Sequence, residues 1–156
     1  MATAGFSARK RRSFSSDGDE VMNGSQQKQL WVEWSAGGLV IQQCAECGVS
    51  QHPPGHVCMN CRSDQLVLGP TSTTATLVAW STVYRAPSTE FAHDLPYTIA
   101  IVRLSGGALL EARVARDIDP DALSVGASIT LTLADVAGRT MPVVGGEALT
   151  KEESQQ

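Results

Sequence analysis

The chain has 156 residues, a formal net charge of −4 and 18% charged residues. This length suffices for one ordinary domain with a small appendage, and because no run of eighteen apolar residues occurs, a transmembrane helix is excluded. The mildly acidic balance also disfavours a general binder of polyanions.

Residues 1–27 are predicted to form a disordered tail. They are rich in Ser and Gly, poor in large apolar residues, and place a basic run at 9–12 ahead of acidic residues at 17–20. Such a segment cannot bury enough surface to offset the entropy lost on ordering. RNA contact by the basic run and a transit peptide are weaker interpretations. Residues 150–156 are predicted to be disordered for the same reason.

No apolar signal-peptide core precedes the first predicted helix, which favours a cytoplasmic location. That helix is expected over residues 25–36, because Leu30 and Trp34 are four residues apart and share one face. Gly37 and Gly38 are expected to end it. A β-branched run, Leu39 to Ile41, then leads into the first cysteine.

All four cysteines lie in two CxxC pairs, Cys44 with Cys47 and Cys58 with Cys61, with ten residues between the pairs. Four thiolates at this spacing can complete the tetrahedral shell of a structural zinc ion. Gly48 follows the first pair, where a chain that wraps a metal often needs a positive φ.

Strands on either side of the cysteines, at 39–41 and 66–68, complete a zinc ribbon, so residues 28–69 are assigned to a helix and zinc ribbon. A unit of this size lacks its own core. The metal is therefore predicted to supply much of its folding free energy.

Four cysteines can also serve other chemistry. Two disulfides need an oxidising compartment, which the absent signal-peptide core disfavours. A rubredoxin-like iron site takes the same ligands, and the ligand set does not exclude it. A catalytic dithiol needs only one CxxC, and a catalytic zinc needs an open position, so both are disfavoured. His52 and His56, between the pairs, are interpreted as loop residues, with ligation as the less favoured alternative.

Residues 70–149 are predicted to form a barrel. Five strands rich in Thr and β-branched residues are expected, at 73–84, 97–104, 108–115, 128–133 and 140–144. A helical turn at 117–124, with Asp119 as N-cap and Pro120 at the first helical position, separates the third strand from the fourth.

Five strands with a helix at that place match the order of an OB-fold. The predicted fold class is therefore mainly β: an N-terminal helix and a rubredoxin-like zinc ribbon, followed by a five-stranded OB-fold barrel.

No set of residues makes a convincing catalytic site. His93 and Asp94, in the polar loop 85–96, are the best general-base pair, although a solvated loop pair is the favoured interpretation. Glu111 and Arg113 stand two residues apart on a strand and are interpreted as an exposed, mutually screened pair. The catalytic residues of this chain are thus predicted to be none.

Several segments together resemble one family. They are Leu30-Trp31, Gly38 to Cys44, Pro53-Pro54, Ser81 to Pro87 and Pro96-Tyr97, in addition to the cysteine pairs. The combination is similar, over about residues 28–145, to the acyl-CoA-associated proteins that join a rubredoxin-like zinc ribbon to an OB-fold, the domain of unknown function thirty-five. The chain departs from the family pattern in its N-terminal tail and at His52, where an apolar or aromatic residue is common.

The resemblance implies a non-catalytic, zinc-binding accessory subunit of an acyl-CoA-processing complex, as in the degradation of lipids or aromatic compounds. Members of this family accompany thiolase-superfamily enzymes (thiolases, acyltransferases or aldolases), and some are joined to hydratase domains. It implies structural zinc, acyl-CoA as a ligand and, because thiolase-like partners are usually dimers, a heterotetramer. Whether the chain has any activity alone stays open; a required subunit of such a complex is expected, with no membrane contact.

Within such a complex, the ribbon and helix are expected to dock on the partner through Trp31, Trp34 and Leu39 to Ile41. Arg85 opens the loop 85–96, and its guanidinium is the candidate contact for a CoA phosphate, with an ordinary surface arginine as the alternative.

Single-stranded nucleic-acid binding is the alternative function, because OB-folds serve it elsewhere. Residues 70–149 hold five Arg and no Lys against eight Asp and Glu. The predicted barrel is therefore acidic, which disfavours tracking of a phosphate backbone. A small iron-containing electron carrier is a third, weaker hypothesis.

Overall fold

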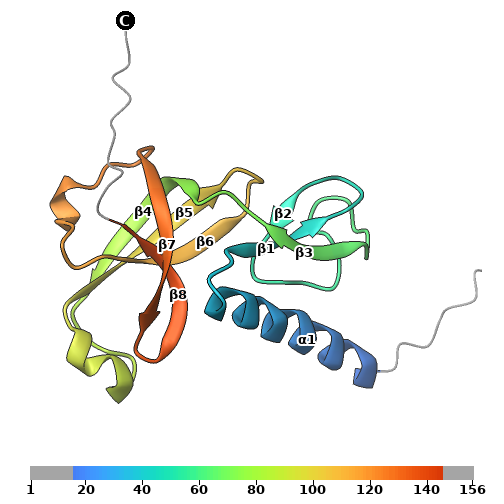
Figure 1. Cartoon of the computed structure of the whole chain (residues 1–156), viewed down its shortest axis with the longest axis horizontal. Helices are drawn as coiled ribbons and strands as arrows, with labels where there is room; N and C mark the ends of the chain where they lie inside the picture. Colours follow the sequence, from blue (N-terminus) through green and yellow to red (C-terminus); the bar gives the residue numbers. More distant parts are fainter. Residues whose placement is uncertain (1–15, 146–156) are drawn as a thin grey trace, which may run out of the picture.

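Helix α1 (Ser16–Ser35) opens the part of the chain that the computed structural model describes, residues 16–145 (Figure 1). It begins well before the predicted start at residue 25, so residues 16–27 of the predicted tail are helical. The other predicted tail residues, 1–15 and 150–156, lie outside the described residues. No helix in residues 16–145 is long and apolar enough to cross a membrane.

The end of α1 turns the chain directly into the ribbon. The backbone N–H of Gly38 donates to the carbonyl of Glu33 at 3.0 Å, and the indole N–H of Trp34 donates to the carbonyl of Val40 at 2.9 Å. These bonds satisfy groups that a helix end leaves open. They also place the first strand against the same helix face that carries Leu30 and Trp34.

The ribbon is a three-stranded antiparallel sheet in the order β2-β1-β3. Its strands are β1 (Val40–Cys44), β2 (Ser50–Gln51) and β3 (Leu66–Pro70). The strands expected at 39–41 and 66–68 are confirmed. The pair of residues in β2 was not predicted, because two residues are too few to show an alternation.

The second lobe is a closed barrel in the order β4-β5-β6-β8-β7, with β6 and β8 parallel and the other neighbours antiparallel. Its strands are β4 (Thr74–Val83), β5 (Tyr97–Leu104), β6 (Leu109–Val114), β7 (Ser128–Val136) and β8 (Arg139–Val144). All five were predicted. Together with the ribbon they confirm the predicted fold class.

Two 3-10 helices lie in the connections between the strands of the barrel. In η2 (Pro120–Ala122), Asp119 caps the turn as predicted, because its side chain accepts a 3.0 Å hydrogen bond from the N–H of Asp121. The other, η1 (Thr89–Asp94), lies in the loop 85–96, where no helix was expected.

One hydrophobic core runs through both lobes. Leu30, Trp34, Leu39 and Ile41 belong to the same buried cluster as the inward side chains of the barrel, and Trp34 and Ile41 are 2% and 0% exposed. The predicted docking surface, Trp31, Trp34 and Leu39 to Ile41, is therefore wrong for Trp34, Leu39 and Ile41, which are buried, while Trp31 and Val40 are partly buried against the same core. The barrel of the same chain already covers them, and each such burial is worth about 1.5–3 kcal/mol.

The turn between β5 and β6 touches β2 of the ribbon. The backbone N–H of Ser50 donates to the carbonyl of Gly106 at 3.1 Å. A Cβ at Gly106 would lie 2.1 Å from the hydroxyl oxygen of Ser50 and 2.7 Å from its Cβ. The two lobes approach so closely here that only glycine fits.

Replacing Gly106 should therefore loosen the joint between the lobes. Gly106→Ala is expected to lower the free energy of unfolding by about 1–3 kcal/mol through overpacking, as measured by urea denaturation. Adding Ser50→Gly removes both clashing atoms and should restore most of the loss. Simple additivity of the two single effects would contradict this explanation.

Candidate functional site

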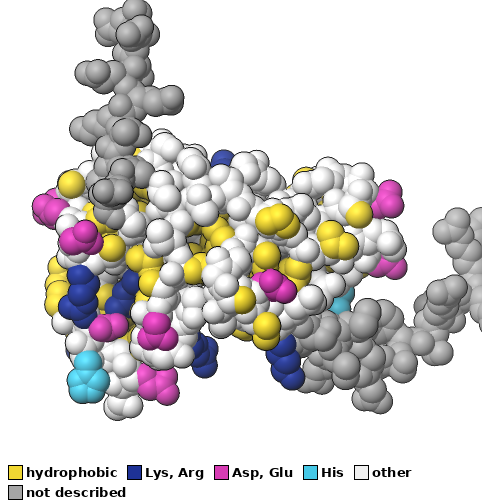
Figure 2. Space-filling view, in the orientation of Figure 1, with side chains coloured by type: hydrophobic (Ala, Val, Ile, Leu, Met, Phe, Trp, Pro, Cys, Tyr) yellow, Lys and Arg dark blue, Asp and Glu magenta, His cyan; other side chains and the backbone are white. Residues whose placement is uncertain are grey.

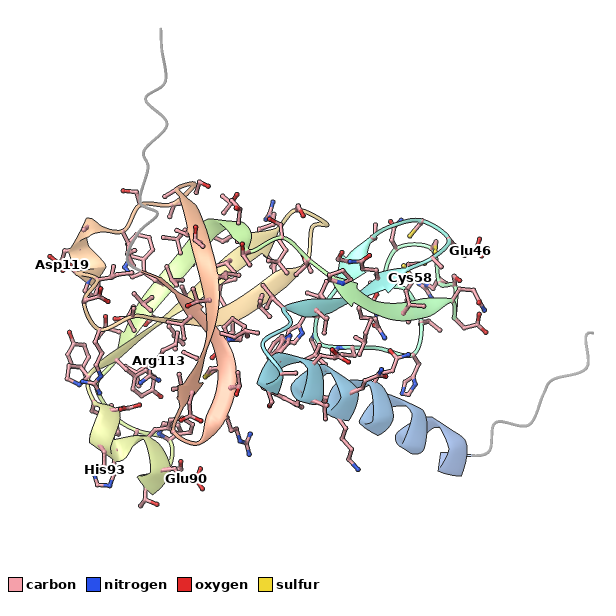
Figure 3. The ribbon with its side chains drawn as sticks, in the orientation of Figure 1. Glu46, Cys58, Glu90, His93, Arg113 and Asp119 are labelled. Carbon is pink, nitrogen blue, oxygen red and sulfur yellow. The ribbon has the colours of Figure 1, made fainter. Side chains whose placement is uncertain are left out.

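The four cysteines converge at the outer end of the ribbon, on the side of the molecule away from the barrel (Figure 3). Their sulfur atoms all lie within 4.8 Å of one another, with 3.5 Å between Cys44 and Cys61 and between Cys47 and Cys58. A tetrahedral ion with Zn–S bonds of about 2.3 Å requires sulfurs about 3.8 Å apart. The cluster therefore fits a four-thiolate metal shell and leaves no position for water.

The two CxxC pairs are held by the same hydrogen bonds. Each first cysteine donates its N–H to the carbonyl five residues later and accepts from the N–H four residues later, at 2.8–3.0 Å. The residue four positions after the first cysteine has a positive φ in both turns, 72° at Gly48 and 66° at Arg62. The sequence signalled the first of these through its glycine and gave no signal of the second.

Backbone N–H groups point at the sulfurs and favour thiolates. The N–H of Val49 lowers the pKa of Cys47 to about 6. In contrast, the pKa of Cys61 rises to about 12, because burial and the other three sulfurs outweigh the N–H of Ser63, which favours the Cys61 thiolate. Four thiolates this close repel one another, so holding all of them ionised requires a cation among them.

A buried pair of glutamines joins the two turns. Gln51 donates from Nε2 to Oε1 of Gln42 at 2.7 Å, and its own Oε1 accepts from the N–H of Met59 at 2.9 Å. Oε1 of Gln42 also accepts from the N–H of Gly55 at 2.8 Å, and its Nε2 donates to the Gly55 carbonyl at 2.9 Å. Because Gln42 lies in β1 and Met59 follows Cys58, this network sets one cysteine pair against the other.

The glutamine network was not predicted from the sequence. Its only signal was a pair of polar residues, Gln42 and Gln43, between the apolar run that ends at Ile41 and the first cysteine. Buried amides are stable when every donor and acceptor is used, and Gln42, which also donates to Gln26, is 0% exposed.

Neither histidine of the ribbon belongs to the sulfur cluster. His56 is exposed, whereas the ring of His52 stacks on Trp34 with 5.8 Å between centroids. Burial lowers the pKa of His52, so a neutral ring packs against the tryptophan. Its Nδ1 has no hydrogen-bond partner among the described residues.

A second polar cluster joins the end of η1 to the end of β6. Asp94 accepts from Arg113 at 3.0 Å and from Arg116 at 2.9 Å. The interpretation of His93 and Asp94 as a solvated pair is therefore wrong for Asp94, while His93 is exposed and labelled at the tip of η1 in Figure 3.

The interpretation of Arg113 as an exposed partner of Glu111 is also wrong. The Arg113 side chain is 11% exposed, its Cζ lies 3.6 Å above the ring centre of Tyr97, and Glu111 is exposed without an ion pair to it among residues 16–145. Burial lowers the pKa of Arg113, with Asp94 acting in the opposite direction; a guanidinium nevertheless stays charged. Arg85 is exposed just after β4, and its contact with CoA stays a prediction.

Two family models match the chain, together over about two thirds of its length. Residues 31–67 match the rubredoxin-like zinc ribbon domain of ChsH2, and residues 70–134 match the C-terminal OB-fold domain of ChsH2. A solved structure titled Ltp2-ChsH2(DUF35) aldolase contains a chain with 25% identity and a TM-score of 0.63, covering 85% of this chain and 96% of that one.

Two curated relatives are similar in sequence. One, a probable enoyl-CoA hydratase alpha subunit of Thermomonospora curvata, is 29% identical over 74% of this chain and 35% of its own length. The chain thus spans about a third of that relative. The other, a DUF35 domain-containing scaffold protein of Methanothermobacter thermautotrophicus, is 29% identical over 63% of this chain and 73% of its own length.

The matching turns allow a controlled test of backbone strain near the sulfurs. Gly48→Ala should lower the free energy of unfolding by about 1 kcal/mol, because a Cβ is unfavourable at positive φ. Arginine and alanine both have a Cβ, so Arg62→Ala adds no strain at this φ. It should change the free energy of unfolding by less than about 0.5 kcal/mol. Equal losses in the two variants, measured by thermal unfolding of the purified protein, would contradict the assignment of strain to φ.

Proposed function

Because the chain belongs to the ChsH2/DUF35 family, with its zinc ribbon and OB-fold domains, we propose that it is a non-catalytic, zinc-binding subunit of an acyl-CoA-processing complex. The observation that carries the proposal is the four-sulfur cluster, built on a ribbon that shares one core with the barrel. The likeness to a chain of an aldolase complex supports it. The partner is a thiolase-superfamily protein, an aldolase or a thiolase, in a complex with two copies of each chain.

In this proposal Cys44, Cys47, Cys58 and Cys61 hold zinc, which closes the ribbon and takes no part in the reaction. The edges of about 3.8 Å that a zinc–thiolate tetrahedron needs agree with the sulfur distances of 3.5–4.8 Å. Holding the four sulfurs as thiolates is the chemistry that the ion supplies. The protein's own N–H groups and the Gln42–Gln51 network orient the ligands, as outer-shell groups do in other metal sites.

Because Trp34, Leu39 and Ile41 are buried in the shared core, docking through the ribbon uses other side chains. Val57, Met59 and Val67 are the exposed large apolar residues on the sulfur-bearing part of the ribbon among the described residues, and Met59 is 77% exposed. Figure 2 shows hydrophobic side chains spread over the outside of this lobe. A partner that covers them gains apolar burial without unfolding the shared core.

Metal content tests the first part of the proposal. Elemental analysis should find bound zinc in the parent protein and should find it lost in Cys58→Ser. Hydrogen exchange in that variant should accelerate in the cysteine turns while β5 stays protected. The matched control is Met59→Ser, in the same turn, which should keep its zinc. Visible absorption by a ferric thiolate would show iron in its place, and full metal content in Cys58→Ser would contradict the ligand assignment.

Reconstitution tests the partner. The chain is co-expressed with a thiolase-superfamily aldolase, and acyl-CoA cleavage is measured for the chain, the aldolase and the pair. Only the pair should be fully active. Met59→Glu should weaken complex formation by tenfold or more, because a carboxylate buried without a partner is unfavourable, and should keep its zinc. Arg85→Gln should raise the KM for acyl-CoA severalfold, whereas Arg103→Gln should not.

Turnover by the chain alone would contradict a non-catalytic role. Salt-sensitive binding of single-stranded DNA by a variant that lacks residues 1–15, with no complex formed, would favour the nucleic-acid alternative.

A further inference from the structure

A cavity of about 430 Å³ opens at the barrel end opposite the ribbon. It lies between the end of β4, the start of β5, the end of β6 and the η2 turn, and its lining includes Thr82, Tyr84, Tyr97, Arg113, Arg116 and Ile118. The volume is that of a site for a small molecule. Figure 2 shows Lys and Arg side chains among acidic and hydrophobic ones at this end.

Arg113 lies in the wall of this cavity with most of its hydrogen-bonding capacity unused. Its side chain is 11% exposed and is held from one side by the Tyr97 ring, 3.6 Å from Cζ. Within residues 16–145 its side chain donates only to Asp94. A guanidinium presents several N–H donors in a planar fork that suits a carboxylate or phosphate. The remaining donors are therefore available to a ligand.

Arg116 supplies a second guanidinium at the same place. It donates to Oδ1 of Asp94 at 2.9 Å and to the Asp94 carbonyl at 3.1 Å, while Arg113 donates to Oδ2 of the same carboxylate. Two cations share one carboxylate, so this cluster carries an excess positive charge. An incoming anion would compete with Asp94 for both arginines, and charge-assisted hydrogen bonds of this kind are the strong ones.

The other side chains of the cavity limit the kind of anion. Asp119 and Asp121 also line it, and their charge opposes a polyanion such as a nucleic acid. Tyr84, 78% exposed, and Ile118 give it apolar surface. Thr82 and Thr98, which share a 2.9 Å hydrogen bond, add hydroxyl groups. These features suit a compact molecule that has one anionic group and an apolar or planar body.

We propose that this cavity binds a small organic anion, with its carboxylate or phosphate between Arg113 and Arg116 and its apolar part against Tyr84 and Ile118. The site depends neither on zinc nor on the proposed partner. Asp94 acts as the internal competitor, because it occupies the arginines when the ligand is absent.

Calorimetric titration of the full chain tests the site, with benzoate and phenyl phosphate as probes at constant ionic strength. The two probes separate a carboxylate ligand from a phosphate ligand. One equivalent of at least one probe should bind. Arg116→Gln should weaken it about tenfold, and Arg103→Gln, an equal change of charge at the far end of β5, should leave it unchanged. Because Arg116 is 70% exposed, its replacement should not unfold the barrel.

Asp94→Asn provides the decisive measurement, since it removes the competing charge and keeps a hydrogen-bonding side chain. It should tighten binding by several fold, roughly up to tenfold for charges this close to the surface, and damage to the fold cannot mimic a gain of affinity. Unchanged or weaker binding by Asp94→Asn would overturn the proposal. So would equal losses in Arg116→Gln and Arg103→Gln, or no binding of either probe up to about 10 mM.

Discussion

The outer end of the ribbon depends on its four sulfur atoms, because it has almost no apolar interior. The buried cluster there consists of Cys44, Cys58 and Leu66. Burying one leucine contributes about 1.5–3 kcal/mol, whereas ordering each residue of the connecting chain costs about 1–2 kcal/mol. Each hydrogen bond of the glutamine network adds only about 1 kcal/mol. The thiolate–metal bonds of the proposed zinc site therefore decide whether this segment is ordered at all.

The inner end of the ribbon is held by different forces. Ile41 lies in the core that the ribbon shares with the barrel, and Cys44 follows three residues later on the same strand. The contact of Ser50 with Gly106 adds a second attachment on the neighbouring strand. A short, rigid path therefore leads from the barrel core to the sulfur cluster. The ribbon's position is fixed by the barrel, while its outer surface stays free to meet another protein.

Features encoded by local pattern were predictable from the sequence. The spacing of the cysteines predicted the sulfur cluster, the alternation around Ile129 and Leu131 predicted β7, and Asp119-Pro120 predicted the cap of η2. The features that failed depend on which surfaces meet across the chain. Trp34 is buried because the barrel lies against α1, and Arg113 is buried because Asp94 and Tyr97 from other segments enclose it. The residues adjacent in sequence to Trp34 and Arg113 do not indicate either contact.

Arg113 also raises a question that stability does not answer. A buried ion pair loses hydration that its Coulomb attraction only partly returns, and apolar replacements of such pairs are often neutral or stabilising. A barrel that only had to remain folded would keep an apolar side chain at this position of β6. Asp119, beside the cavity, and Cys58, in the sulfur cluster, are labelled at opposite ends of the molecule in Figure 3. The arginine is thus remote from the sulfur cluster, and the proposed anion site gives a reason for its cost that stability alone does not supply.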